Sequence, residues 1–188
     1  MPEPSALPRL ALRLPWRSIA LLAVATGLTV GVVLWMAYLG GVTTFRLRYG
    51  LLAPLVSFPA HLALTLTPVG EFVPFAAANG ALYGLWGGAF LSWAAWVLGA
   101  VLQRVYGAGV SREMGGVDAL PAWTRRYPLG HPLTLTFARW VPGVGALVDA
   151  VAGAQGVSFG RHLACAALGH APQAVFFSAV GAELVRLL

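Results

Sequence analysis

The feature that most constrains this chain is the length of its uncharged apolar runs. Residues 18–39, 72–103 and 162–182 contain no Asp, Glu, Lys or Arg. As a helix, the first run would be about 33 Å long, enough to cross a hydrocarbon core of about 30 Å. The second run is too long for one span and is interrupted by Pro74 and by several glycines. Because these runs show no polar face, the chain is predicted to be an all-α integral membrane protein.

Composition and charge support this prediction. The chain is 59% hydrophobic and 10% charged, with a mean hydropathy of +0.77, whereas soluble domains carry about 25% charged residues. All 12 basic residues are Arg, and they are spread along the chain without a basic stripe, which argues against nucleic acid as a partner. The net charge of +6 is instead assigned to membrane topology and anionic headgroups.

The arginines also predict the orientation of the chain. Three of them precede the first run, at positions 9, 13 and 17, so the positive-inside rule places an N-terminal segment, residues 1–17, in the cytoplasm. Residues 18–188 then form one membrane domain whose first transmembrane helix is 18–39. Residues 107–130 contain further arginines and are predicted to form a second cytoplasmic stretch, a polar loop.

Prolines and glycines divide the rest of the domain into two similar parts. Two short apolar arms flank a break at Thr67-Pro68-Val69-Gly70-Glu71, which predicts a re-entrant hairpin over 49–83, followed by a transmembrane helix over 84–106. The pattern recurs with a hairpin over 131–155 and a transmembrane helix over 160–185. The fold expected is therefore two re-entrant hairpins plus about three transmembrane helices.

The two predicted hairpins are related as an inverted repeat. One crossing separates them, so they enter the membrane from opposite faces. The sequence itself carries a matching series of breaking residues in the two parts: Pro68, Gly80 and Gly84 in the first, and Pro142, Gly153 and Gly156 in the second.

The candidate functional site is the break in the second hairpin. Arg139 is the only charged residue between positions 126 and 149. Its guanidinium cannot be deprotonated, so it needs water, a counter-charge or an anionic ligand. A phosphate headgroup suits this side chain together with backbone N–H groups at the start of a helix. The predicted substrate-binding residues are Arg139, Pro142, Gly143 and Gly145.

Two acids are predicted to act with this arginine. Glu71 lies at the tip of the first hairpin, and Asp149 follows the break in the second. A carboxylate at membrane depth beside an Arg can respond to bound substrate and exchange protons. Alternatively, Glu71–Arg139 or Asp149–Arg139 is an ion pair that only holds the hairpins together. Both interpretations remain open at this point.

Two segments resemble a known family. PVGEFVPFAAANGALYG (residues 68–84) and RWVPGVGALVDAVAG (residues 139–153) resemble the hallmark segments of the DedA family, also called SNARE-associated or VTT-domain proteins. The first is similar to its Pro-x-Gly-Glu segment followed by small residues. The second is similar to Arg-x-x-Pro-x-x-Arg with a later Gly, of which Arg139, Pro142 and Gly153 fill three positions. The resemblance covers about residues 45–185.

The resemblance implies opposed re-entrant hairpins and transport of a phosphate-bearing lipid, either undecaprenyl phosphate or a phospholipid, in some members coupled to protons. It also implies a multi-pass protein of a bacterial inner (plasma) membrane. The chain departs from the pattern at Gly145, where the second Arg would stand, and at Asp149, where many members have an apolar residue or Pro. The family also often carries Gly-Asp after a Gly-Ala pair in the helix that follows the first hairpin, whereas Gly99-Ala100 is followed here by Gln103-Arg104. The chain therefore resembles a divergent member, and whether Asp149 replaces this missing acid stays open.

Two other functions are weighed against transport. One is a non-catalytic membrane assembly or homeostasis factor. The other is an intramembrane hydrolase using Ser92 and His170, but the sequence has no Gly-x-Ser-x-Gly and no paired His-Glu metal motif. The chain is therefore not expected to be an enzyme or to bind a metal or cofactor. Its four histidines are interpreted as packed or interfacial side chains, and self-association into a homo-oligomer is left open.

Overall fold

The computed structural model describes residues 47–66, 73–119, 130–141 and 144–187, together with isolated residues between 20 and 44. The regular elements of this part of the chain are helices, with no β-strand among them. The all-α prediction is therefore confirmed. Most of the predicted first transmembrane helix, 18–39, lies outside the described residues.

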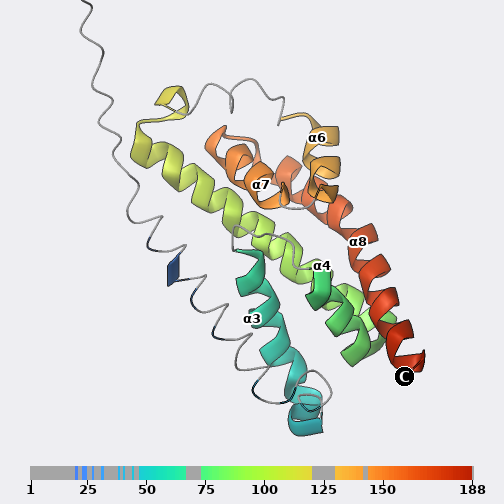
Figure 1. Ribbon diagram of the computed structural model, residues 1–188. Helices are drawn as coiled ribbons and strands as arrows, with labels where there is room; N and C mark the ends of the chain where they lie inside the picture. Colours follow the sequence, from blue (N-terminus) through green and yellow to red (C-terminus); the bar gives the residue numbers. More distant parts are fainter. Residues whose placement is uncertain are drawn as a thin grey trace, which may run out of the picture.

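Two long apolar helices dominate the molecule (Figure 1): α4 (Val73–Met114) and α8 (Phe159–Leu187). Both are long and apolar enough to cross a membrane. Large hydrophobic side chains on both helices are exposed rather than packed in the core, among them Phe90, Leu102, Leu168, Phe176 and Leu184. Apolar surface of this extent on the outside of a helical protein suits contact with lipid.

Gly84 divides α4 into two parts. Its φ of 74° and ψ of 176° are not helical, and this backbone conformation favours glycine because a Cβ would be strained. The chain reverses at this residue, so α4 consists of a return limb, residues 73–83, and a long helix, residues 85–114. The long helix ends at Met114 before two glycines with positive φ, Gly115 and Gly116. It thus extends into the segment predicted as a polar loop, which begins with the apolar and small residues that a helix accepts.

The first helical hairpin consists of the 3₁₀ turn η1 (Gly50–Leu52), α3 (Ala53–Thr65) and the return limb 73–83. Helix α3 begins with a proline in its first turn, where the missing N–H costs nothing. Ala53 packs with Leu82 near one end of the hairpin, and Leu64 packs with Phe75 near the other. The two limbs are therefore antiparallel (Figure 1).

The second helical hairpin consists of α6 (Pro132–Phe137), the 3₁₀ turn η3 (Ala138–Trp140) and α7 (Gly145–Ala154). The His131 side chain caps α6 by accepting a hydrogen bond from the Leu133 N–H at 3.3 Å. Leu135 of α6 packs with Val148 and Ala152 of α7 in a buried cluster that also includes Cys165 of α8. This cluster fixes the second hairpin on α8.

The same pattern of close contacts occurs twice. Each hairpin's return limb lies against the long helix of the other half of the molecule, at glycines where an added Cβ would collide with the facing backbone. In one interface these contacts are Gly80 with Ser178 and Gly181 with Ala77; in the other they are Gly153 with Arg104 and Gly107 with Ala150. A glycine with positive φ follows each return limb, Gly84 at 74° and Gly156 at 72°.

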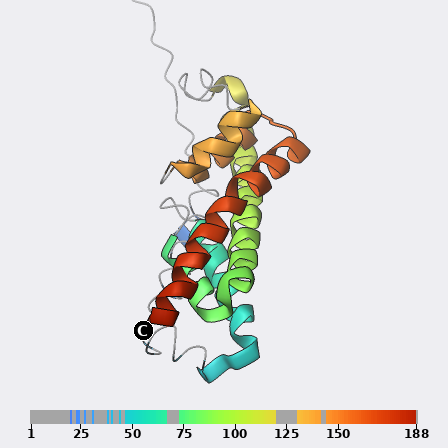
Figure 2. The same cartoon turned by 90° about the vertical axis from the view of Figure 1, so that its right-hand side faces the viewer.

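The two long helices cross near their middles (Figure 2). The Trp93 indole N–H donates to the Ala167 carbonyl at 2.9 Å, and the rings of Trp96 and His170 have centroids 5.6 Å apart. Both hairpins reach this crossing: Gln103 donates to the Thr65 carbonyl at the end of α3, and Trp140 of η3 donates to the Gly169 carbonyl at 3.1 Å. The centre of the molecule is therefore where elements from both halves meet.

Candidate functional site

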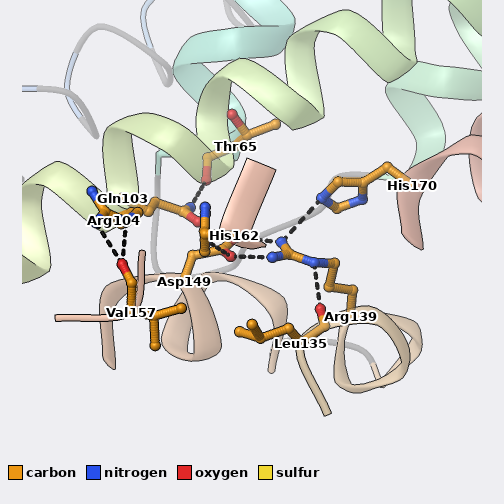
Figure 3. A network of polar contacts seen from close by, with 9 residues as sticks. All are labelled: Thr65, Gln103, Arg104, Leu135, Arg139, Asp149, Val157, His162 and His170. Atoms are coloured by element: carbon orange, nitrogen blue, oxygen red, sulfur yellow. Dashed lines mark hydrogen bonds and ion pairs between the residues drawn. The ribbon is translucent and has the colours of Figure 1, made fainter. Parts of the chain in front are cut away.

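Arg139 is fully buried at the end of the first limb of the second hairpin, with 0% of its surface exposed. Its Nε donates to the Leu135 carbonyl at 2.7 Å. Its NH1 donates to Asp149 Oδ2 at 2.7 Å, and its NH2 lies 2.6 Å from Asp149 Oδ1 (Figure 3). The first contact is a hydrogen bond and the second an ion pair, so both terminal nitrogens of the guanidinium face the carboxylate, and we call this arrangement the Arg139 fork. A guanidinium faces a carboxylate or a phosphate with the same two nitrogens.

The local backbone brings these two side chains together. Helix α6 tightens into a 3₁₀ turn at residues 138–140, and Val141 is extended, with φ −89° and ψ 118°. Helix α7 then runs in the other direction from Gly145, which places Asp149 in its second turn, facing Arg139. The turn between the limbs thus places the cation Arg139 on the first limb opposite the anion Asp149 on the second.

Two histidines of α8 complete the cluster. His162 Nε2 donates to Asp149 Oδ1 at 2.7 Å, and His170 Nε2 lies 3.4 Å from Arg139 NH1, from which it can accept (Figure 3). All four side chains are at most 2% exposed. We call Arg139, Asp149, His162 and His170 the Arg139 centre. Within the described part of the chain, no three His, Cys, Asp or Glu side chains are arranged to hold a metal ion.

The charges of the Arg139 centre balance in the observed state. A buried ion pair is costly to break, since removal of one partner from such a pair destabilises proteins by about 3–5 kcal/mol. The Asp149 carboxylate is therefore the counter-charge that stabilises the buried guanidinium of Arg139. An anionic ligand can take a bidentate position on Arg139 only by replacing the Asp149 carboxylate.

The other residues predicted to belong to the site are not part of the Arg139 centre as the structure describes it. Gly145 is the buried first residue of α7, so its N–H lies in the first helical turn, where the helix supplies no acceptor. Pro142, Gly143 and Glu71 lie outside the described residues. Of the two ion pairs considered from the sequence, the structure contains Arg139–Asp149, and this pair joins the two limbs of one hairpin rather than two hairpins.

A second polar cluster lies in the first half of the molecule. Asn79 Nδ2 donates to His61 Nδ1 at 3.1 Å and to Ser92 Oγ at 3.0 Å. The three residues come from α3, the return limb and the long helix, and none is more than 1% exposed. We call them the His61 centre. The Trp96 ring connects the two centres, with centroid distances of 5.5 Å to His61 and 5.6 Å to His170.

Three polar atoms at the His61 centre have no hydrogen-bond partner among the described residues: His61 Nε2, Asn79 Oδ1 and Trp96 Nε1. Burying a donor or acceptor without a partner costs about 1–3 kcal/mol each. Because Asn79 donates to Nδ1 of the His61 ring, the ring proton of a neutral His61 is on Nε2. Within the described part of the chain, two N–H donors and one carbonyl acceptor are therefore left without a partner.

The contacts of the histidines are not evident from the sequence. The sequence predicts packed or interfacial side chains, whereas the structure places His61, His162 and His170 in polar clusters. The one available signal was the spacing of His162 and His170, eight residues apart in one apolar run, which puts them about two turns apart on a helix.

The molecule also has an open groove of about 900 Å³ away from both centres. It lies beside the Gly84 turn and the end of α8, and apolar side chains such as Leu82 and Val185 line most of it. The charged residue at its edge, Arg186, pairs with Glu183 at 2.7 Å. The groove is therefore distinct from the Arg139 centre, and its lining cation is an exposed one in an ion pair.

Comparison with known proteins adds one finding. A family model described as the VTT domain matches residues 67–183, which include the return limb of the first hairpin, the long helix, the whole second hairpin and most of α8. No curated protein and no solved structure matches the chain. The match covers more than half of the chain and includes both Arg139 and Asp149.

Proposed function

Because the chain belongs to the VTT-domain family, the family of DedA and SNARE-associated proteins, we propose that it is a membrane transporter that moves a phosphate-bearing lipid between leaflets. The substrate is undecaprenyl phosphate or a phospholipid. The observation that carries this proposal is the buried fork of Arg139, which is held by an acid of the same hairpin. A guanidinium that faces a carboxylate with both terminal nitrogens presents the donors that a phosphate also uses.

The two hairpins are proposed to be re-entrant and to form an inverted repeat. Their tips come only to the middle of the long helices: Thr65 contacts Gly99, and Arg139 contacts Gly169. The repeated contacts of the return limbs support the same arrangement. In transporters of inverted-repeat architecture, substrates bind near the midplane between the repeats, where irregular backbone lines the site.

Transport is proposed to work by exchange at Arg139. A lipid phosphate replaces Asp149 in the fork, and Asp149 keeps its hydrogen bond from His162. The N–H groups in the first turn of α7, including that of Gly145, for which the helix supplies no acceptor, add donors near the phosphate. When Asp149 returns to Arg139, the phosphate is released, so the protein does not trap its own substrate.

This exchange also offers a route for coupling to protons. A carboxylate that loses its guanidinium partner in a buried site favours the protonated form. Proton uptake by Asp149 on substrate binding would link movement of the lipid to a pH gradient. The proposed setting is the inner (plasma) membrane of a bacterium, with the N-terminal segment in the cytoplasm.

The proposal is tested with purified protein in proteoliposomes. Arg139→Ala is expected to abolish movement of undecaprenyl phosphate and of a glycerophospholipid, each measured with and without a pH gradient. Arg112→Ala is the matched control, because Arg112 is exposed and its Nε bonds the Ala108 carbonyl away from both centres. Movement retained by folded Arg139→Ala protein would contradict the assignment, and release of phosphate from a labelled lipid would point to a hydrolase.

One observation favours a second candidate, a non-catalytic assembly or homeostasis factor. The Arg139–Asp149 pair is compact and fully buried, as expected of a pair that only fixes the two limbs of a hairpin. That role predicts that an apolar pair at the two positions preserves function, since a well-packed apolar pair can replace a buried ion pair without loss of stability. Phosphate binding predicts that the same replacement abolishes function.

A further inference from the structure

The His61 centre and the Arg139 centre are built in the same way. Each takes one side chain from the first limb of its hairpin, one from the return limb and one from the long helix that follows. In the first half these are His61, Asn79 and Ser92, and in the second half they are Arg139, Asp149 and His162. Each half therefore carries a buried polar cluster that joins both limbs of its hairpin to its long helix.

The repeat of close contacts also relates two aromatic residues that lie where the two centres meet. The repeated contacts relate the long helices by an offset of 74 residues, since Gly107 and Arg104 correspond to Gly181 and Ser178. The same offset relates Trp96 to His170, and these two rings face each other at 5.6 Å. His61 contacts Trp96 as Arg139 contacts His170.

The two centres differ in charge. The Arg139 centre contains a permanent cation and its counter-ion, whereas the His61 centre contains only an imidazole, an amide and a hydroxyl. The atoms of the His61 centre and of Trp96 that have no partner among residues 47–66, 73–119, 130–141 and 144–187 are the His61 Nε2–H and Trp96 Nε1–H donors and the Asn79 Oδ1 acceptor. A group that both accepts and donates hydrogen bonds can partner donors and acceptors alike, and a hydroxyl is such a group.

We propose that His61, Asn79 and Trp96 form a second binding site, which takes a hydroxyl group of the transported lipid headgroup. This inference rests on the proposed transport of a phosphate-bearing lipid. It narrows the substrate class to lipids that carry a hydroxyl at the headgroup, either the P–OH of a phosphate monoester or an alcohol next to the phosphate. Because the His61 centre contains no cation, this site is expected to prefer a neutral hydroxyl to an anionic oxygen.

The test compares three lipids in proteoliposomes. Phosphatidic acid supplies a P–OH, phosphatidylglycerol supplies alcohol hydroxyls, and phosphatidylmethanol has an anionic phosphate without any hydroxyl. Wild-type protein is expected to move at least one of the first two about tenfold faster than phosphatidylmethanol, the ratio expected for a hydrogen bond made only to the hydroxyl. Preference for phosphatidic acid alone identifies the P–OH as the group, and preference for phosphatidylglycerol alone identifies the alcohol.

Three variants assign the preference to the His61 centre. His61→Phe keeps a ring against Trp96 but removes the donor, so the ratio of rates is expected to fall to about one. Ser92→Ala, which removes the hydroxyl that positions Asn79, is a milder variant that is expected to lower the ratio. Ser178→Ala removes another fully buried hydroxyl, one that bonds the Ala76 carbonyl, and is expected to keep the wild-type ratio. An equal rate for all three lipids, or a ratio unchanged in folded His61→Phe, overturns the proposal.

A second readout does not depend on transport. Nitrogen NMR of ¹⁵N-histidine-labelled protein in bilayers reports the hydrogen bond of His61 Nε2, with His61→Phe assigning the signal. The signal is expected to move in vesicles containing the preferred hydroxyl-bearing lipid but not in those containing phosphatidylmethanol. A shift without any transport would contradict the proposed function and leave the site intact. The same signal position in all three lipids would overturn the site itself.

Discussion

Replacing Asp149 by Asn is expected to tighten binding of a phosphate-bearing lipid and to slow its transport. Asn has the size of Asp and keeps an oxygen acceptor for His162, but it lacks the charge that holds the Arg139 fork. A hydrogen bond to a charged group is worth about 1.5–3 kcal/mol. If the phosphate no longer competes with an interaction of this size, its dissociation constant is expected to fall by about 10- to 150-fold.

The same substitution removes the group that displaces the phosphate. The rate of lipid movement at saturating substrate is therefore expected to fall while affinity rises. The assay pairs binding of radiolabelled undecaprenyl phosphate to purified protein with its movement in proteoliposomes. Glu183→Gln is the matched control, because this exposed acid pairs with Arg186 outside the Arg139 centre. Affinity that stays the same or weakens in folded Asp149→Asn protein would refute the exchange of carboxylate for phosphate.

Two further predictions concern stability. Arg139→Met and Asp149→Leu are each expected to destabilise the protein by about 3–5 kcal/mol, or about 6–20 °C in Tm. The double variant is expected to recover most of this loss but not to transport. Additive losses of the two substitutions in thermal unfolding would contradict a direct pair. Gly107→Ala is expected to cost about 1–3 kcal/mol because its Cβ meets the Ala150 carbonyl, whereas Gly109→Ala, whose Cβ meets nothing within 4 Å, is expected to be neutral or stabilising; equal melting temperatures would contradict the close packing of α7 on α4.

The helical character and the place of the charged site could be predicted because both follow from local sequence. Uncharged runs of this length leave few alternatives to apolar helices. Arg139 stands out because a permanent charge within apolar, Pro- and Gly-interrupted sequence must be compensated somewhere. The glycines noted as a possible repeat, such as Gly80 and Gly153, take equivalent contacts in the structure because both allow a return limb to approach a long helix.

The partners of Arg139 could not be predicted in full because they depend on how α7 and α8 pack together. Asp149 and Glu71 were equally available as counter-charges in the sequence, and only the reversal of the chain before Gly145 places Asp149 in the fork. His61 meets Asn79 through the antiparallel packing of two limbs. A single histidine in an apolar run gives no sign of such a contact, since packed histidines are found in the same kind of sequence.

The measurement that tests the central claim most directly is movement of one lipid with and without its phosphate. Proteoliposomes containing the wild-type chain are loaded with undecaprenyl phosphate or with undecaprenol, which has the same chain and a hydroxyl in place of the phosphate. We predict protein-dependent movement of the phosphate form that is lost in Arg139→Ala, and no protein-dependent movement of the alcohol. Equal movement of both lipids, or no movement of any phosphate-bearing lipid, would contradict transport through the phosphate.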